Sequence, residues 1–278
     1  MKREVIKETD FQNEDRPETR LAQFKDIFKH RFLELLKISL LHTVFLMPLL
    51  VSLIIFYALV RNSNDINSLM TVFLIQGASF LISMPSSFVG TTGTFYCMKK
   101  LSYAEGEFAA SSFFIGMREE WKKGLFIGLL AGISLALTLI GFFFLFFRVS
   151  SVDPVMTGLG IALLGIQSIL VLMVSYYAVG QVVVYSNKLR YIYKNSFIMT
   201  LIRFPFNLAF FILYPGIFIA LFCIMEITMF VGVGLIIFFS AIGHLMWMLN
   251  DLSAFDKFIN KEQYPDYYRK GLKIHKEA

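Results

Sequence analysis

The sequence predicts an all-α membrane protein in which six transmembrane helices form three helical hairpins, with amphipathic helices at the cytoplasmic interface. Composition is the first sign, because 56% of the 278 residues are hydrophobic and only 17% are charged, whereas an ordinary soluble domain carries about 25% charged residues. The second sign is that the charges stand in blocks, separated by apolar runs long enough to cross a hydrocarbon core of about 30 Å. The third is the alternating placement of basic residues.

The apolar runs define the predicted spans, which are 38–60, 69–98, 124–147, 157–184, 206–225 and 230–248. The second and fourth runs exceed a straight span, so we expect tilt or kinking, with Pro85 as the kink point of the second. A single helix over residues 206–248 would be about 65 Å long, more than twice the hydrocarbon core. The last two runs are therefore expected to form a tight hairpin with Glu226 at its outer turn.

Basic residues fix the expected orientation, since they resist translocation across the membrane. All 26 Lys and Arg residues except Arg61 and Arg148 fall in four segments, namely the N-terminal segment, 99–123, 185–205 and the tail after Met248. Six spans place all four segments on one side. We therefore predict that both termini are cytoplasmic. The excess positive charge of +6 is interpreted as topology signals and contacts with anionic lipids, not as a nucleic-acid surface.

The segments outside the spans are expected to differ in character. Residues 1–23 form a polar tail that has no apolar signal-peptide core, residues 24–248 form the transmembrane domain, and residues 249–278 form a cytoplasmic tail. Aromatic-rich amphipathic stretches at 24–37, 113–121 and 197–204 are expected to lie along the inner leaflet before each odd-numbered span. Three true repeats and three unrelated hairpins both remain open.

Strongly polar or conformationally special residues inside apolar runs are the candidate functional residues, because polar groups in a bilayer are costly. They are His42, Gln76, Pro85, Gly90, Gly93, Gln167, Gln181, Asn207, Glu226 and His244. Counting from the predicted span ends places His42, Gln181, Asn207 and His244 within roughly 6 Å of the cytoplasmic interface. Only Gln76 and Gln167 lie deep, and neutral amides bridge helices but carry no proton.

The sequence shows no catalytic, cofactor-binding or metal site that can be assigned. His42 and His244 could pair across the bundle or hold a metal, but two histidines without a third ligand make a weak metal site. Residues 85–93 could be an unwound stretch on a transport path, or a set of small residues that allows two helices to approach closely. Cys97 and Cys223 lie in apolar runs and are interpreted as small buried hydrophobic residues.

Four segments resemble the YesL-like family of bacterial integral membrane proteins. They read GTTGTFYCMKKL from Gly90, FFIGMREEWKKG from Phe113, FDKFINK from Phe255 and YPDYYRKGL from Tyr264, together with the acidic Glu105 and Glu107. The resemblance covers roughly residues 24–272. It implies a multi-pass protein of the bacterial cytoplasmic membrane with an accessory role beside a sugar transporter, and it implies no catalytic residues.

The resulting expectation is an accessory or regulatory membrane protein, not an enzyme, that acts through its cytoplasmic segments. One alternative is a small transporter or channel with a path near the second and fourth helices. A second alternative is a membrane enzyme that acts on lipid headgroups through His42 and His244.

Overall fold

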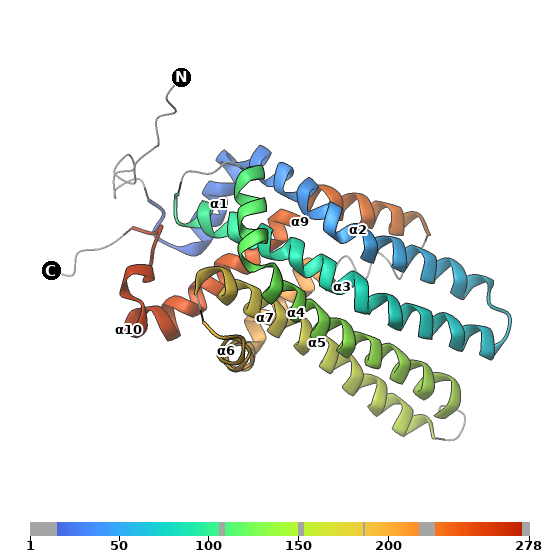
Figure 1. The fold of residues 1–278 in the computed structure, drawn as a ribbon. Helices are drawn as coiled ribbons and strands as arrows, with labels where there is room; N and C mark the ends of the chain where they lie inside the picture. Colours follow the sequence, from blue (N-terminus) through green and yellow to red (C-terminus); the bar gives the residue numbers. More distant parts are fainter. Residues whose placement is uncertain (1–15, 106–108, 150–152, 186, 217–225, 274–278) are drawn as a thin grey trace.

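The computed structural model describes residues 16–105, 109–149, 153–185, 187–216 and 226–273, and over these ranges the chain is helical without a strand. Five long helices form the bundle (Figure 1): α2 (Phe32–Asn62), α3 (Ile66–Ser102), α4 (Ala109–Phe144), α5 (Pro154–Val184) and α9 (Glu226–Phe255). The shorter helices are α1 (Arg20–His30), α6 (Leu189–Ile202), α7 (Phe204–Phe211) and α10 (Lys261–Gln263).

Polar caps set where several of these helices begin. The Asp65 carboxylate accepts hydrogen bonds from the backbone N–H groups of Asn67 and Ser68 at the start of α3. Asp153 caps α5 in the same way, with Pro154 in the first helical position. Because the first N–H groups of a helix have no partner within the helix, a carboxylate before the apolar run satisfies them. The short turn at 63–65 between α2 and α3 follows from these local signals.

Two parts of the predicted fold are confirmed over the described residues. These are the all-helical class and the presence of five to six helices long enough to cross a membrane. Five described helices are long and apolar enough to cross a membrane, and the pair 189–202 and 204–214, which is bent by 92°, would make a sixth. Figure 1 looks nearly along α6 while the long helices run across the view. Residues 217–225, the second half of the predicted fifth span, lie outside the described residues.

Several helix bounds differ from the predicted spans. The second run, 69–98, lies inside a helix of 37 residues, and the sixth, 230–248, continues to Phe255. The fifth forms helix only to Phe211 and then a π-helical turn, Ile212–Gly216. Hydropathy marks the end of an apolar run, not the end of a helix. The backbone hydrogen bonds of a helix can continue through polar residues when other helices pack against them.

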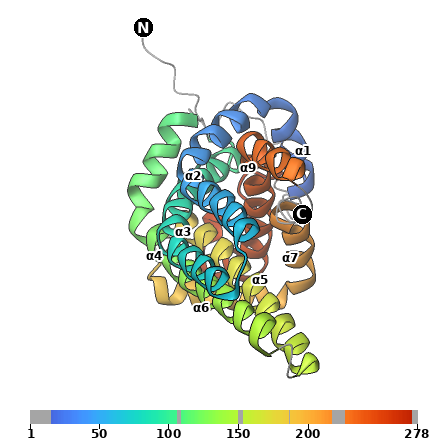
Figure 2. The ribbon, with the colours of Figure 1, turned by 90° about the vertical axis from the view of Figure 1, so that its right-hand side faces the viewer.

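The three predicted interfacial stretches are divided differently in the structure. Arg31 separates α1 from α2 within 24–37, and Arg203 separates α6 from α7 within 197–204. The stretch 113–121 belongs to the continuous helix α4, although the first turns of α4 run in a different direction from the rest in Figures 1 and 2. Their placement at a lipid interface remains a prediction.

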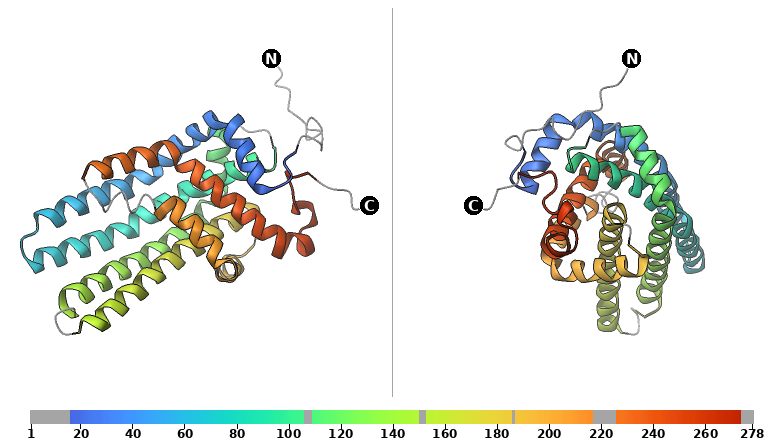
Figure 3. Two further views of the ribbon diagram at one scale, coloured as in Figure 1. Left: turned by 180° about the vertical axis from the view of Figure 1, so that it is seen from behind. Right: turned by 60° about the vertical axis from the view of Figure 1, so that its left-hand side comes forward.

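The segments predicted to share one side of the membrane do meet at one end of the bundle. Figure 3 shows the blue N-terminal and red C-terminal elements together, away from the turn between α2 and α3. Contacts join them, since Gln23 of α1 hydrogen-bonds to the carbonyl oxygens of Ser102 and Gly271. The core of the bundle lies near this end and includes the fully buried side chains of Phe95, Tyr177 and Trp247.

Candidate functional site

One side of α9 carries a stripe of buried residues. Ser240, His244, Trp247 and Asp251 are each at most 1% exposed, and their spacing of four, three and four residues places them on one face of a helix. At a rise of 1.5 Å per residue, the stripe extends about 16 Å along the bundle. Polar groups at this depth are costly unless they are hydrogen-bonded, so the partners of the stripe define the candidate site.

The N-terminal part of the stripe forms a histidine cluster, which we define as His42, Thr91, Tyr214, Ser240 and His244. The two imidazole rings lie edge to face, with centroids 4.6 Å apart. Nδ1 of His42 lies 3.3 Å from the Ser240 hydroxyl, and Nε2 lies 3.3 Å from the Thr91 hydroxyl. The two predicted histidines therefore do pair across the bundle, between the first and last long helices.

The hydrogen bonds of His244 fix which of its nitrogens carries the proton. Its Nδ1 lies 2.6 Å from the backbone oxygen of Ser240 and 3.3 Å from the Tyr214 hydroxyl. Because a carbonyl oxygen only accepts, whereas a hydroxyl can accept or donate, Nδ1 is the donor. In the neutral ring Nε2 is then an acceptor, and this buried atom has no hydrogen-bond partner among the described residues. Buried polar atoms without a partner are uncommon, so this atom is a candidate contact point for a proton donor.

Beside the histidine cluster lies a cavity of about 510 Å³ between α2, α3, α4, α5 and α7. Thr91 and Tyr176 line it, and both also touch the cluster, Thr91 through His42 and Tyr176 through ring contact with His244. The other lining groups are mostly apolar, with Ser87 and Ser168 as further hydroxyls. A cavity of this size can hold a ligand, and its lining suits an apolar chain rather than an ion.

A second cluster, the amide cluster, consists of Tyr177, Asn207 and Asn250. The Tyr177 hydroxyl donates to Asn207 Oδ1 at 2.9 Å, and Asn250 Nδ2 donates to the same oxygen at 3.1 Å. Asn207 in turn donates to the backbone oxygen of Thr200. Nearby, the predicted Gln181 donates to the Ser196 hydroxyl at 2.9 Å. These bonds tie α5, α6, α7 and α9 together.

Asp251 stands apart from both clusters. It is fully buried, and within the described part of the chain neither carboxylate oxygen has a hydrogen-bond partner. The carboxylate packs directly on the backbone of α5, since a Cβ at Gly180 would overlap Asp251 Oδ2. A carboxyl group held in this way is costly to bury, which marks it as a functional candidate.

The remaining sequence candidates do not join these groups. Gln76 is buried and its Nε2 lies 3.4 Å from the Ser52 hydroxyl, whereas Gln167 is exposed on the outside of α5 and donates to Ser134. Neither lines the cavity. Glu226 is the first residue of α9, and its side chain lies outside the described part.

The stretch from Pro85 to Gly93 is not unwound, because α3 runs through it without a break. A Cβ at Gly90 would collide with Phe45 of α2, and one at Gly93 would collide with the backbone oxygen of Phe113 in α4. Of the two interpretations left open by the sequence, the helix geometry favours close packing through small residues.

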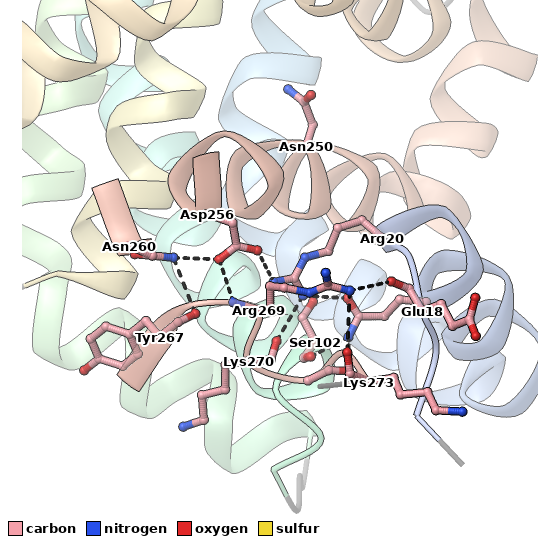
Figure 4. A network of polar contacts seen from close by, with 12 residues as sticks. Glu18, Arg20, Ser102, Asn250, Asp256, Asn260, Tyr267, Arg269, Lys270 and Lys273 are labelled. Carbon is pink, nitrogen blue, oxygen red and sulfur yellow. Dashed lines mark hydrogen bonds and ion pairs between the residues drawn. The ribbon is translucent and has the colours of Figure 1, made fainter. Parts of the chain in front are cut away.

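A third polar region, the terminal latch, closes the end of the bundle (Figure 4). We define it as Arg20, Gln23, Ser102, Asp256, Asn260 and residues 267–271. Arg20 forms an ion pair with Asp256 at 2.7 Å, with both side chains about one-tenth exposed. The other oxygen of Asp256 accepts hydrogen bonds from Asn260 Nδ2 and the backbone N–H of Arg269. One carboxylate therefore connects α1 to the C-terminal tail.

A tyrosine hydroxyl reinforces the latch. Tyr185, just after α5, donates to Asn260 Oδ1 at 2.5 Å. Burial, and then the neighbouring Tyr103, raise the pKa of Tyr185 above its usual value, so the hydroxyl remains a donor at all physiological pH values.

The sequence prediction missed Asp251, Asn250 and the latch. The predicted sixth span ends at Met248, whereas α9 continues to Phe255 and buries Asp251 among its neighbours. The helical spacing of Ser240, His244, Trp247 and Asp251 is visible in the sequence and, with a longer helix, indicates the stripe. His42 lies ten residues, about 15 Å, from the start of α2, and its depth relative to the membrane interface stays a prediction.

Among the described residues, no three His, Cys, Asp or Glu side chains come together as a metal site. Cys97 is buried and its thiol lies 3.7 Å from the backbone oxygen of Ala109, while Cys223 falls outside the described ranges. No family model matches the chain, and no curated protein or solved structure matches it either.

Proposed function

We propose that the protein is an accessory or regulatory component of the bacterial cytoplasmic membrane that acts through the end of the bundle carrying the terminal latch. Carbohydrate transport is the process that the YesL-like resemblance suggests. The observation that supports the proposal is the latch itself, because Asp256 joins α1 to the C-terminal tail while Gln23 joins both to the end of α3. These bonds hold α1, the end of α3 and the C-terminal tail together, which would present a rigid end of the bundle to a partner protein.

The three predicted hairpins, with both termini in the cytoplasm, belong to the same proposal. The basic segments meet at the latch end, and the bent pair α6 and α7 suits a helix that lies along the membrane and then turns into it. Anionic lipids would then face the same end of the bundle as the partner.

Sugar uptake in a deletion strain tests the proposal. We expect uptake of at least one sugar to fall, and to be restored by the wild-type protein. Asp256→Asn should restore it poorly, because breaking a largely buried ion pair costs on the order of 3 kcal/mol and frees the tail. Asp153→Asn, a cap at the other end where asparagine also caps, is the matched control.

The proposal fails if deletion leaves uptake of every tested sugar unchanged and no transporter subunit co-purifies with the native protein. It also fails if Asp256→Asn and Asp153→Asn restore uptake equally at equal membrane abundance.

A second candidate function is transport or binding of an apolar solute along the second and fourth long helices. The cavity of about 510 Å³ favours it, because α3 and α5 supply most of the lining. Gly165→Phe should fill this cavity, whereas Gly158→Phe, seven residues earlier with open space beside it, should not. Equal binding of an apolar fluorescent probe by both variants would exclude the cavity.

A lipid-headgroup enzyme that uses the histidines has no support in the geometry. His42 and His244 are 2% and 1% exposed, so a headgroup at the interface would not reach them.

A further inference from the structure

A second cavity lies near the latch end and differs from the first in chemistry. It has a volume of about 300 Å³ and lies between α1, α7 and α9. Arg20 and Arg203 line it together with Asn250 and Ser253. The other lining residues are apolar and include Phe24, Phe206, Phe210 and Met246. The cavity thus combines guanidinium groups with an aromatic and aliphatic wall.

Arg203 lies at the bend of the chain between α6 and α7. These two helices meet at 92°. If α7 enters the bilayer and α6 lies along it, the bend places Arg203 at headgroup level. Its neighbour Phe206 is 64% exposed and Leu21 is 67% exposed, which fits side chains that face acyl chains rather than water.

The hydrogen bonds leave part of Arg203 available. Nη1 donates to the backbone oxygen of Asn250 at 3.0 Å, and no contact of Nε or Nη2 with a hydrogen-bond acceptor occurs within the described ranges. Asp256 is paired with Arg20, and the buried Asp251 is attracted by the charge of Arg203 but makes no hydrogen bond to it. The guanidinium carbon also lies 5.7 Å from the centroid of the Phe206 ring. A planar guanidinium whose Nε and Nη2 make no hydrogen bond among the described residues can still offer these N–H groups to the oxygens of a phosphate group.

We propose that this cavity binds one anionic phospholipid, with its phosphate on Arg203 and an acyl chain along the wall formed by α1, α7 and α9. Charge complementarity and the division of the cavity into a cationic and an apolar part support this occupant over an uncharged lipid. Basic pockets between helices at a membrane surface bind anionic headgroups on the same principle. This site rests on the membrane placement of α6 and α7 proposed above and shares Arg20 with the terminal latch, but it requires no partner protein.

Binding is measured on the full-length protein in uncharged detergent, by native mass spectrometry and by the shift of the thermal unfolding midpoint. The probes are phosphatidylglycerol, phosphatidylcholine with the same chains, and inorganic phosphate. We expect phosphatidylglycerol to bind at least about tenfold more tightly than phosphatidylcholine, because a charge-assisted contact contributes more than a neutral one. Inorganic phosphate alone should give no shift, since it lacks the chains.

Two variants test the two halves of the site. Arg203→Gln should abolish the preference for phosphatidylglycerol, whereas Arg190→Gln, on the exposed side of α6, should retain it. Arg203 also donates to the backbone of Asn250, so its loss could disturb the packing of α9. The second variant, Met246→Trp, therefore keeps Arg203 and fills the apolar part of the cavity. It should weaken phosphatidylglycerol binding by a similar factor.

Three results would overturn the proposal. Equal binding of the two lipids would remove the role of charge. An equal loss in Arg190→Gln and Arg203→Gln would assign the effect to surface charge in general. Stabilisation by inorganic phosphate as large as that by the lipid would indicate a free anion site instead.

Discussion

The contact between Gly180 and Asp251 gives a sharp test of the packing around the buried carboxyl. An alanine at position 180 would place its Cβ against Oδ2, Cγ and Cβ of Asp251. Asp251 is short and fully buried, so it cannot swing away as a long flexible side chain would. Overpacking of this kind costs about 1–3 kcal/mol, which corresponds to a fall of roughly 2–10 °C in the unfolding midpoint.

The same helix supplies the control. Gly165 in α5 has open space where a Cβ would stand, so Gly165→Ala should stabilise by up to about 1 kcal/mol through helix propensity. A double-mutant cycle isolates the contact, because Gly180→Ala should cost much less when Asp251→Ala is also present. Unfolding can be followed with a thiol-reactive dye, since Cys97 is buried and becomes reactive only when the bundle opens, in a Cys223→Ser background.

Close packing of α5 on α9 at this point is refuted if Gly180→Ala and Gly165→Ala have the same midpoint. It is refuted equally if the cost of Gly180→Ala is unchanged in the Asp251→Ala background, because the clash would then lie elsewhere.

Three further predictions concern topology, pH and the tail. Cysteines at Asn64 and Ser151 should react with an impermeant thiol reagent in intact cells, and cysteines at Asn187, Lys188 and Lys273 should not. A cysteine at Ser102 would not discriminate, because this position is fully buried and would stay unlabelled on either side. Labelling at Lys273 from outside, together with the expected labelling at Asn64, would place the termini on opposite sides and exclude an even number of spans. Hydrogen bonds from Ser68 lower the pKa of the Asp65 carboxyl, so its stabilisation of α3 is full above the unfolded pKa of about 3.9 and is lost as the pH falls through the lower folded pKa. Asp65→Ala should therefore lower the stability of the protein at pH 7 and have little effect on it at low pH. As a control, the stability of Asp65→Asn should depend little on the titration of this position. A destabilisation by Asp65→Ala that is constant with pH would argue against the cap. Tyr185→Phe removes the hydrogen bond to Asn260, which should cost about 1–3 kcal/mol because the amide oxygen is left unsatisfied. Hydrogen exchange of the backbone amides over residues 256–272 should then accelerate. Unchanged exchange would show that the tail is held without this bond.

The helical class, the membrane as solvent and the grouping of the basic segments could all be predicted from the sequence. These properties depend on the length of apolar runs and on the charges between them, which are local in the chain. Asp65 and Asp153 also mark the starts of α3 and α5, because a cap acts on the next two or three residues. The side of the membrane on which the termini lie rests on charge alone and stays a prediction.

Which polar residues meet depends on the packing of the helices and could not be predicted. His42 and His244 are about 200 positions apart, and their rings touch because α2 and α9 pack side by side. The predicted span ends at Met248 and leaves Asp251 outside the apolar run, yet α9 continues to Phe255 and Gly180 lets α5 close over the carboxylate. Burial of a polar side chain is set by how closely other helices approach it, and that approach depends on residues far away in the sequence.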